Sequence, residues 1–333
     1  MKKAVYIFLV FSITSCFTPD EYLPKIDSEK INISLNSTES PSTFIKLGFP
    51  TGSLSKEKSN WQLRLENTAD EWGIYTNPTE PIRIFNTKIN RYDLINLSSI
   101  DGNTIWEYDD VKSTNIKSAI GRWGDFDFPN PESYKDVYIL NWTQDSQDYY
   151  YKFQILDADI NTYHFKYGPL DETSFQIETI NKQEVQLYSY FSLVNNEQVK
   201  TIEPNTNEWH IHFSYQVDSI NKHTKIPYSS TSNSSLGLFP SFELNHEHVE
   251  VFLDTVMKFE QINYINSRNL TFEKSKNSIG LFYQKDAMTS QLQSNSKQNL
   301  ILRSDDEYYV IRALDIIGSS VGNHSVTFEI KKL

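Results

Sequence analysis

The chain has 333 residues, of which 38% are hydrophobic and 14% aromatic, and its formal net charge is −12 at pH 7. That length is ample for a packed core and exceeds one typical domain, so two domains are expected. The basic residues are scattered through an acidic chain, which excludes nucleic acid as a natural partner. Twenty Tyr and twenty Phe, many of them beside Thr, Ile and Val, favour strands over helices.

The first sixteen residues have the pattern of an export signal. Lys2 and Lys3 precede a short apolar run, which is followed by Ile13-Thr14-Ser15-Cys16. These four residues resemble the bacterial lipobox, in which the cysteine thiol takes the lipid. Cys16 is the only cysteine of the chain and has no disulfide partner. We therefore predict a lipoprotein signal peptide over 1–16 and lipidation at Cys16; the alternative is ordinary secretion with an incidental cysteine.

Residues 17–42 are polar and rich in Ser and Asn, without a sustained period. This composition predicts a flexible tether between the anchor and the folded part. Asp20-Glu21 resembles the acidic export tag of Bacteroidetes surface lipoproteins, although a merely solvated tether explains the pair equally well. The predicted location is the outer membrane, through the lipid anchor, on the cell surface.

The first β-rich domain is predicted over 43–171. Its clearest strand is Trp61 to Glu66, in which large apolar residues alternate with Gln62, Arg64 and Glu66, so the polar three are expected to face water. The domain closes with Tyr150-Tyr151-Lys152-Phe153-Gln154-Ile155-Leu156-Asp157 and a last strand that stops at Gly168-Pro169. A linker is predicted over 172–185.

The second β-rich domain is predicted over 186–333, because the same landmarks return in the same order. The closing strand reappears as Tyr308-Tyr309-Val310-Ile311-Arg312-Ala313-Leu314-Asp315, 158 positions further on (308 minus 150). Tyr190 to Leu193 opens the unit, Trp209 to Phe213 matches the Trp61 strand, and Asn277 to Phe282 echoes Ser118 to Trp123. Asn299 to Arg303 then matches Asp136 to Asn141, and Val326 to Ile330 matches His164 to Tyr167. Four ordered correspondences indicate a tandem repeat of one β-rich unit.

These landmarks resemble those of the HmuY-like lipoproteins of Bacteroidetes, in a two-unit form. The matching positions are Ser118 to Trp123, Tyr150 to Asp157, Tyr190 to Leu193, Trp209 to Phe213 and Tyr308 to Asp315. The resemblance implies an all-β surface lipoprotein that holds haem between side-chain ligands and works beside a TonB-dependent receptor. Two departures bear on the ligand contacts. The family's Asp after each strand Trp is replaced by Gln62 and His210, and a Gly-rich stretch is replaced by Ser229 to Ser235.

Any haem site is expected in the second unit. Six of the seven histidines lie there, as do Met257 and Met288, and haem iron takes axial His or Met ligands. The candidate ligands are His210, His212, His246, His248 and Met257. His210 and His212 are two apart on a strand and so are expected to share a face.

Packing is the alternative for each pair of histidines. Residues 239–244 and 249–253 look like the two strands of a hairpin, which places His246 and His248 at its exposed tip. No fourth ligand accompanies His246, His248 and Glu250, so no metal site is predicted.

The sequence does not predict an enzyme, because it has no nucleophile elbow, zinc-protease motif or phosphate-binding glycine loop. The leading hypothesis is therefore non-catalytic capture of haem or a similar cofactor beside an outer-membrane transporter. A glycan-binding or adhesive module is the first alternative, with the rings of Trp72, Trp106, Trp123 and Trp142 stacking on sugars. An accessory subunit without a small-molecule ligand is the second, and it predicts an exposed apolar patch.

Overall fold

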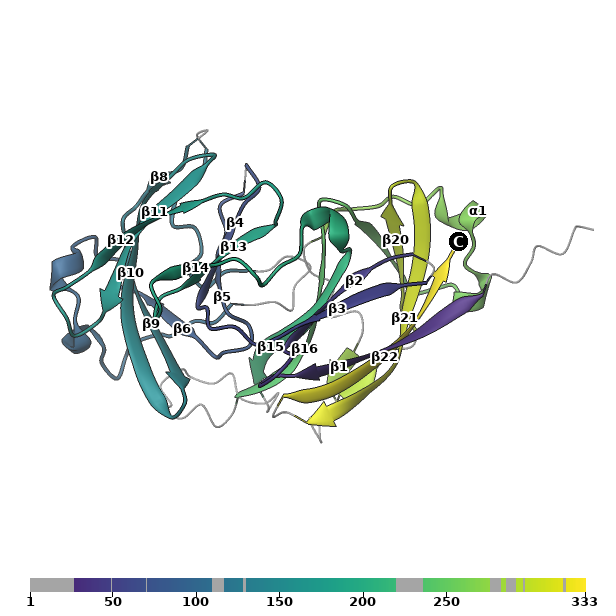
Figure 1. Cartoon of the computed structure of the whole chain (residues 1–333), viewed down its shortest axis with the longest axis horizontal. Helices are drawn as coiled ribbons and strands as arrows, with labels where there is room; N and C mark the ends of the chain where they lie inside the picture. The colour runs from purple at the N-terminus through teal and green to yellow at the C-terminus, as the bar shows by residue number, and fades with distance from the viewer. Residues whose placement is uncertain are drawn as a thin grey trace, which may run out of the picture.

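The computed structural model describes residues 27–48, 50–69, 71–109, 117–127, 130–219, 236–275, 283–285, 292–295, 297–319 and 322–333. In these ranges the chain consists mainly of antiparallel strands, which confirms the predicted all-β class. Four sheets follow one another along the long axis of the molecule (Figure 1). The predicted signal peptide with Cys16 lies outside the described residues, as do residues 17–26 of the predicted tether.

We number the four sheets I to IV along this axis. Sheet I has the order β12 (Gln176–Asn181), β11 (Thr162–Pro169), β10 (Gln147–Ala158), β9 (Val137–Gln144) and β6 (Arg83–Asn86). Sheet II has the order β14 (Glu197–Val199), β13 (Tyr188–Ser192), β4 (Leu63–Glu66) and β5 (Ile74–Thr76).

The other two sheets lie toward the C-terminal end of the molecule. Sheet III has the order β16 (Leu236–Leu244), β15 (Ile211–Ser219), β2 (Ser42–Lys46) and β3 (Gly52–Lys56). Sheet IV has the order β1 (Ser28–Asn36), β22 (Asn323–Lys332), β21 (Glu307–Ser319), β20 (Asn299–Ser304) and β17 (Glu250–Asp254). Two small hairpins pair β7 (Gly124–Asp125) with β8 (Glu132–Ser133), and β18 (Tyr283–Lys285) with β19 (Leu292–Ser294).

The sheets form two β-sandwiches, each with its own core. Sheets I and II enclose an aromatic core that includes Trp123, Trp142 and Phe153. Sheets III and IV enclose a second core that includes Phe213 and Phe328, whose rings stack at 5.3 Å between centroids. Alternating side chains of each strand supply these cores, as expected for strands that present one face to a partner sheet.

The predicted repeat is confirmed at the level of individual residues. β10 and β21 both occupy the third place of their five-stranded sheets, between equivalent neighbours. Each carries a β-bulge, between Ile155 and Asp157 in one copy and between Ala313 and Asp315 in the other. The offset between the bulges equals the offset between the two sequence motifs, so the motifs are structural equivalents.

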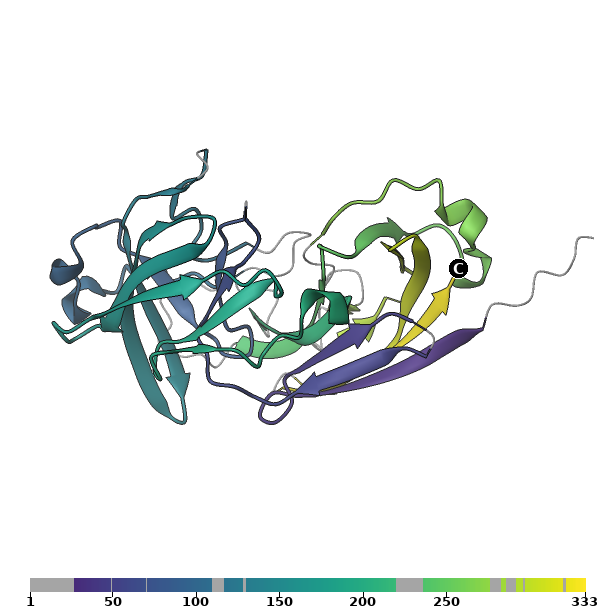
Figure 2. The same ribbon diagram turned by 45° about the horizontal axis from the view of Figure 1, so that its top comes forward.

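The repeats exchange their first three strands. By position, β1, β2 and β3 of the second sandwich correspond to β12, β13 and β14 of the first. Yet β1–β3 precede the first repeat in sequence and β12–β14 precede the second. Each three-stranded segment therefore completes the sandwich of the other repeat. Figure 2 shows β1–β3, in purple, lying with the yellow C-terminal strands rather than with the strands that follow them.

This exchange corrects the expected boundaries. Residues 28–36 were expected in the tether but form β1, which pairs along its whole length with β22. The expected linker over 172–185 contains β12, the edge strand of sheet I. Residues 42–56 belong to the second sandwich and residues 188–199 to the first. The physical reason is that local patterning makes a strand but does not select which of two similar sheet edges it joins.

Equivalent segments cap the two far ends of the molecule. Residues 89–107 cover the outer face of sheet I and contain the 3₁₀ turns η1 (Tyr92–Leu94) and η2 (Leu97–Ser99). Residues 256–274 cover the outer face of sheet IV and contain η5 (Phe259–Gln261) and the short helix α1 (Tyr264–Ser267). A further turn, η3 (Thr206–Glu208), precedes β15. In the described part of the chain, no helix has the length and apolarity needed to cross a bilayer.

Candidate functional site

The two sandwiches meet through the outer faces of sheets II and III (Figure 1). Phe44 and Trp209 on one side pack in the same apolar cluster as Trp61, Tyr188 and Tyr190 on the other. The sequence led us to expect Gln62, Arg64 and Glu66 in water, but the exposed fractions of these residues are 0%, 4% and 3%. That prediction was wrong because the polar face of β4 packs against a second sheet instead of solvent.

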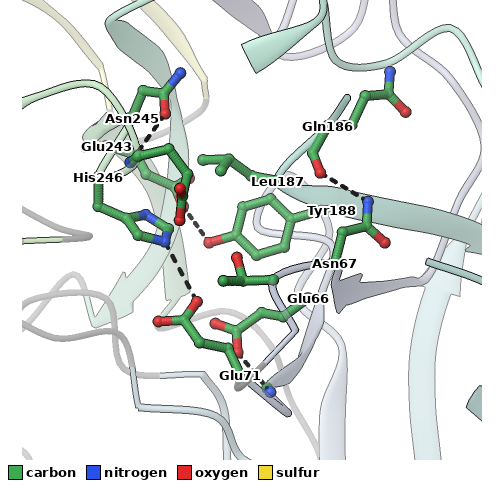
Figure 3. A network of polar contacts seen from close by, with 12 residues as sticks. Glu66, Asn67, Glu71, Gln186, Leu187, Tyr188, Glu243, Asn245 and His246 are labelled. Carbon is green, nitrogen blue, oxygen red and sulfur yellow. Dashed lines mark hydrogen bonds and ion pairs between the residues drawn. The ribbon is translucent and has the colours of Figure 1, made fainter. Parts of the chain in front are cut away.

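A buried ion pair crosses this junction. Arg64 Nη1 on β4 donates to Glu243 Oε2 on β16 over 2.9 Å, and their side chains are 5% and 8% exposed. Tyr188 on β13 donates its hydroxyl to Glu243 Oε1 at 2.7 Å, and Figure 3 shows the phenol reaching across to this carboxylate. The Arg64 guanidinium also lies 4.4 Å from the centroid of the Tyr188 ring. Both charges are thus compensated within the protein, as burial requires.

His212 lies on the same face of sheet III, beside Glu243. Its ring stacks on Phe44 at 4.1 Å, and its Nδ1 is 3.6 Å from Glu243 Oε2. Burial lowers the pKa of His212 even though Glu243 favours the charged form. Burial opposes the ionisation of Glu243, but Arg64 outweighs it and holds the pKa of this carboxyl well below its usual range. The junction therefore holds an ionised Glu243, a charged Arg64 and a neutral His212 near pH 7.

A second polar contact joins the sandwiches nearby. His246 Nε2 lies 3.3 Å from Glu71 Oε2, and Figure 3 shows the imidazole pointing from the second sandwich toward this carboxylate. Beside this contact, and within the first sandwich, Asn67 donates to the carbonyl of Gln186 at 2.9 Å. The two sandwiches are thus joined by polar contacts as well as by an apolar cluster.

Two cavities lie on either side of Arg64 at this junction. The larger, with about 30 Å³ of internal space, is lined by Trp61, Tyr190 and His212 among others. The smaller, with about 20 Å³ of internal space, lies beside Thr76 and Asp109. A space of this size holds about one or two water molecules, so a larger ligand would enter only if the two sandwiches moved apart at this point.

Two polar atoms of residues that line the larger cavity have no hydrogen-bond partner in the described part of the chain. They are Nε of Arg64 and Nε2 of His212. A buried nitrogen without a partner is costly, so a water molecule or a ligand is expected to satisfy it. Arg64 offers a donor, whereas neutral His212 offers either a donor or a lone pair according to its tautomer.

The structure separates His210 from His212 despite their spacing of two. His210 precedes β15, and its Nδ1 accepts a hydrogen bond from the backbone N–H of Leu47 at 2.9 Å. Its Nε2 lies 3.4 Å from Ser304 Oγ. Burial lowers the pKa of His210 to about 4. Of these two histidines, His212 lines the larger junction cavity, whereas the ring of His210 contacts Leu47 and Ser304.

The remaining candidate ligands lie elsewhere. β16 and β17 belong to different sheets, so the predicted hairpin does not form, and His246 is buried instead of lying at an exposed tip. His248, two residues further along the same turn, is half-buried. Met257 lies in the end cap, packed against the outer face of sheet IV. His223, Met288 and residues 229–235 fall outside the described residues.

The five candidates thus occupy several sites, and none of the described residues form a group of three or more His, Cys, Asp or Glu side chains placed to hold a metal ion. The tryptophans named for the glycan hypothesis, Trp72, Trp106, Trp123 and Trp142, are all buried, at 7% exposure or less. Their rings pack in the cores of the molecule, which leaves none of them free to stack on a sugar.

Comparisons with protein-family models, with curated proteins and with solved structures gave no match to this chain. The HmuY-like resemblance therefore stays a prediction.

Sequence reasoning missed the residues that build the junction. Arg64, Tyr188 and Glu243 come from three separate segments and have no shared motif. The one available signal was the cation Arg64, which stands between Leu63 and Leu65 in a short strand. This pattern is as compatible with a polar face that packs on a second protein layer as with one that faces water.

Proposed function

We propose that the protein is a lipid-anchored, non-catalytic capture protein that holds a small ligand in the larger junction cavity, beside His212. In this proposal Cys16 carries the lipid, the protein stands on the outer-membrane surface, and the captured ligand passes to an outer-membrane transporter. The observation that carries the proposal is the cavity itself, which lies between two copies of one β-sandwich. It is lined by an imidazole whose Nε2 has no hydrogen-bond partner among the described residues.

Haem is the first ligand to test, because the resemblance implies it and His212 is the histidine that lines the cavity. The two sandwiches would have to separate at the junction to admit a ligand of that size. A histidine that ligates iron presents one ring nitrogen to the metal while the other faces a hydrogen-bond acceptor. His212 has Nδ1 toward Glu243, and its Nε2 has no partner within the part of the chain that the structure describes. The aromatic side chains of Trp61 and Tyr190 supply apolar walls for a planar ligand.

The test is a titration of haemin into the protein lacking residues 1–16. We expect a Soret shift that saturates at one haemin per chain at micromolar protein, and we expect His212→Gln to weaken the binding at least tenfold. His164→Gln is the matched control, because His164 lies on β11 of the first sandwich, away from the junction.

Two outcomes count against this assignment. A titration without a Soret shift excludes haem as the ligand. Thermal-shift screening of planar carboxylates then tests whether the cavity binds a different small ligand. Equal binding by His212→Gln and the wild type places the ligand outside the junction cavity. Thermal unfolding of each variant shows whether a loss of binding reflects a loss of the fold.

A role as an accessory subunit of a transporter is the second candidate, and one observation favours it. The end cap of the first sandwich exposes several large apolar side chains, as that hypothesis requires: Ile89 at 42%, Leu94 at 54%, Leu97 at 51% and Ile105 at 68%. Substituting Leu94 and Leu97 by Ser would then abolish co-purification with the transporter while haemin binding is unchanged.

A further inference from the structure

The point where the chain enters the folded part lies at one end of the molecule. Ser28, the first residue of β1, pairs with Lys331 of β22. Lys331 Nζ donates to the carbonyls of Phe259 and Ile262, at 3.0 and 2.7 Å, and both belong to the 256–274 cap. Figure 1 accordingly shows the start of β1, helix α1 and the C-terminus together at the right-hand end.

That entry point restricts how far the 256–274 cap can lie from a lipid on Cys16. Twelve positions separate Cys16 from Ser28. A chain of that length spans at most about 40 Å when fully extended. The equivalent cap of the first sandwich, residues 89–107, lies at the opposite end of the molecule (Figure 1).

The 256–274 cap also has the surface chemistry of a membrane interface. It exposes Val256 at 88%, Ile265 at 61% and the phenol of Tyr264 at 47%. An aromatic ring with a polar tip beside aliphatic side chains is the composition found at the level of lipid headgroups. The Tyr264 ring packs edge-on against Tyr308, which fixes the surface to sheet IV.

Charge distinguishes the two equivalent caps. Residues 256–274 contain Lys258, Arg268 and Lys274 against Glu260 and Glu273, a net charge of +1 in a chain of −12. Residues 89–107 contain Arg91 against Asp93, Asp101 and Glu107, a net charge of −2. Basic residues next to a membrane are attracted to its anionic lipids and acidic ones are repelled.

We propose that the 256–274 cap, through Val256, Tyr264 and Ile265, rests on the lipid surface, so that the second sandwich is next to the membrane and the first faces away from it. The inference rests on the lipid anchor of the proposed function and adds the orientation of the molecule. The junction cavity then lies above the membrane, between a sandwich that contacts lipid and one that is presented to solvent.

The test uses the full lipidated protein in vesicles of phosphatidylethanolamine and phosphatidylglycerol that contain a headgroup-level nitroxide quencher. Because Cys16 is the only cysteine and is modified by lipid, Ile265→Cys or Leu97→Cys introduces a single thiol for a small fluorophore. Leu97 is the matched control, since it is similarly exposed in the equivalent cap. We expect at least threefold stronger quenching at position 265 than at position 97.

The outcomes separate this inference from its premise. Protein that floats with the vesicles but is quenched equally at both positions, or at neither, overturns the orientation alone. Protein that does not float with the vesicles overturns the lipid anchor, and the orientation with it. Replacing Val256 and Ile265 together by Asp, read through a fluorophore on Tyr264→Cys, is expected to halve the quenching while flotation persists.

Discussion

Gln62 and His210 perform the same task at equivalent places in the two repeats. Gln62 Oε1 accepts a hydrogen bond from the backbone N–H of Leu193, and His210 Nδ1 accepts one from the backbone N–H of Leu47, both at 2.9 Å. Each donor follows the end of an exchanged strand. An acceptor side chain after the strand tryptophan therefore fixes the exchanged segment to the sandwich that receives it.

This equivalence predicts which substitutions of His210 are tolerated. His210→Gln supplies the acceptor that already serves in the first repeat, so we expect a loss of less than about 1 kcal/mol in the free energy of unfolding. His210→Leu leaves the buried N–H of Leu47 without a partner, which costs about 1–3 kcal/mol more. Urea denaturation at pH 7.5 measures both, and equal losses for the two variants would contradict the role assigned to the ring nitrogen.

The same histidine is expected to make the fold sensitive to acid. Burial lowers the pKa of His210 to about 4 in the folded state, against an ordinary value near 6.5. Between these values the unfolded chain binds a proton that the folded chain does not, so stability falls as the pH drops from 6.5 to 4. The full difference amounts to about 3 kcal/mol.

His210→Gln removes one titrating group and should reduce the slope of this part of the stability profile. Burial also lowers the pKa of His212 and of His324, so these two histidines are expected to keep part of the slope. Unfolding in urea at several pH values between 4 and 7 measures the effect. His164→Gln, which removes a half-exposed imidazole of the first sandwich, is the control for the loss of a histidine elsewhere in the chain. A profile of His210→Gln as steep as that of the wild type would rule the explanation out.

The ion pair across the junction predicts that removing the charge of Glu243 costs much more stability than removing that of an exposed carboxylate. Glu243→Gln leaves the charge of Arg64 buried without compensation, which is expected to cost about 3–5 kcal/mol. Glu250→Gln breaks the pair with Arg303, whose side chains are 31% and 37% exposed, and should cost about 0–1 kcal/mol. Chemical denaturation of both variants measures the two losses in the free energy of unfolding. Similar costs would show that the junction pair is solvated or redundant.

The sequence predicted local structure well for hairpins, in which the two paired strands are neighbours along the chain. The turns Asp145-Ser146 and Asp305-Asp306 connect β9 to β10 and β20 to β21, and alternation within each strand determined which face is buried. Partner choice over long distances was not predictable. β1 and β12 are both amphipathic edge strands, and nothing in their local pattern states which five-stranded sheet they complete.

The junction shows why the candidate site was found only in part. Alternation of Leu63, Arg64 and Leu65 correctly separates two faces, but it cannot tell whether the polar face meets water or another protein layer. Hydropathy favours water, and tertiary packing decided otherwise. His212 was singled out from its residue type, whereas its partner Glu243 became visible only when β16 was seen to pair with β15.

The two equivalent turns predict a matched gain of stability. All four central residues have positive φ, from 48° to 65°, in the two-residue turns that favour Gly. Ser146→Gly and Asp306→Gly each remove a steric cost, so each should raise the free energy of unfolding by on the order of 1 kcal/mol. Thr143→Gly, in the exposed end of β9, is the control and should lower it. Opposite signs for the two turn variants would contradict their equivalence.

The strand exchange predicts that two fragments of equal length behave differently. Residues 57–205 contain every strand of the first sandwich, so this fragment should be a folded monomer with a cooperative unfolding transition. Residues 27–175 follow the sequence repeat but separate β1–β3 from β15 and β22, and lack β12–β14. This second fragment should be unfolded, or dimeric through reciprocal exchange of β1–β3. Near-ultraviolet circular dichroism and light scattering after size exclusion distinguish these states. A folded monomer from residues 27–175 would show that each repeat can keep its own strands, and that the exchange is not required by the fold.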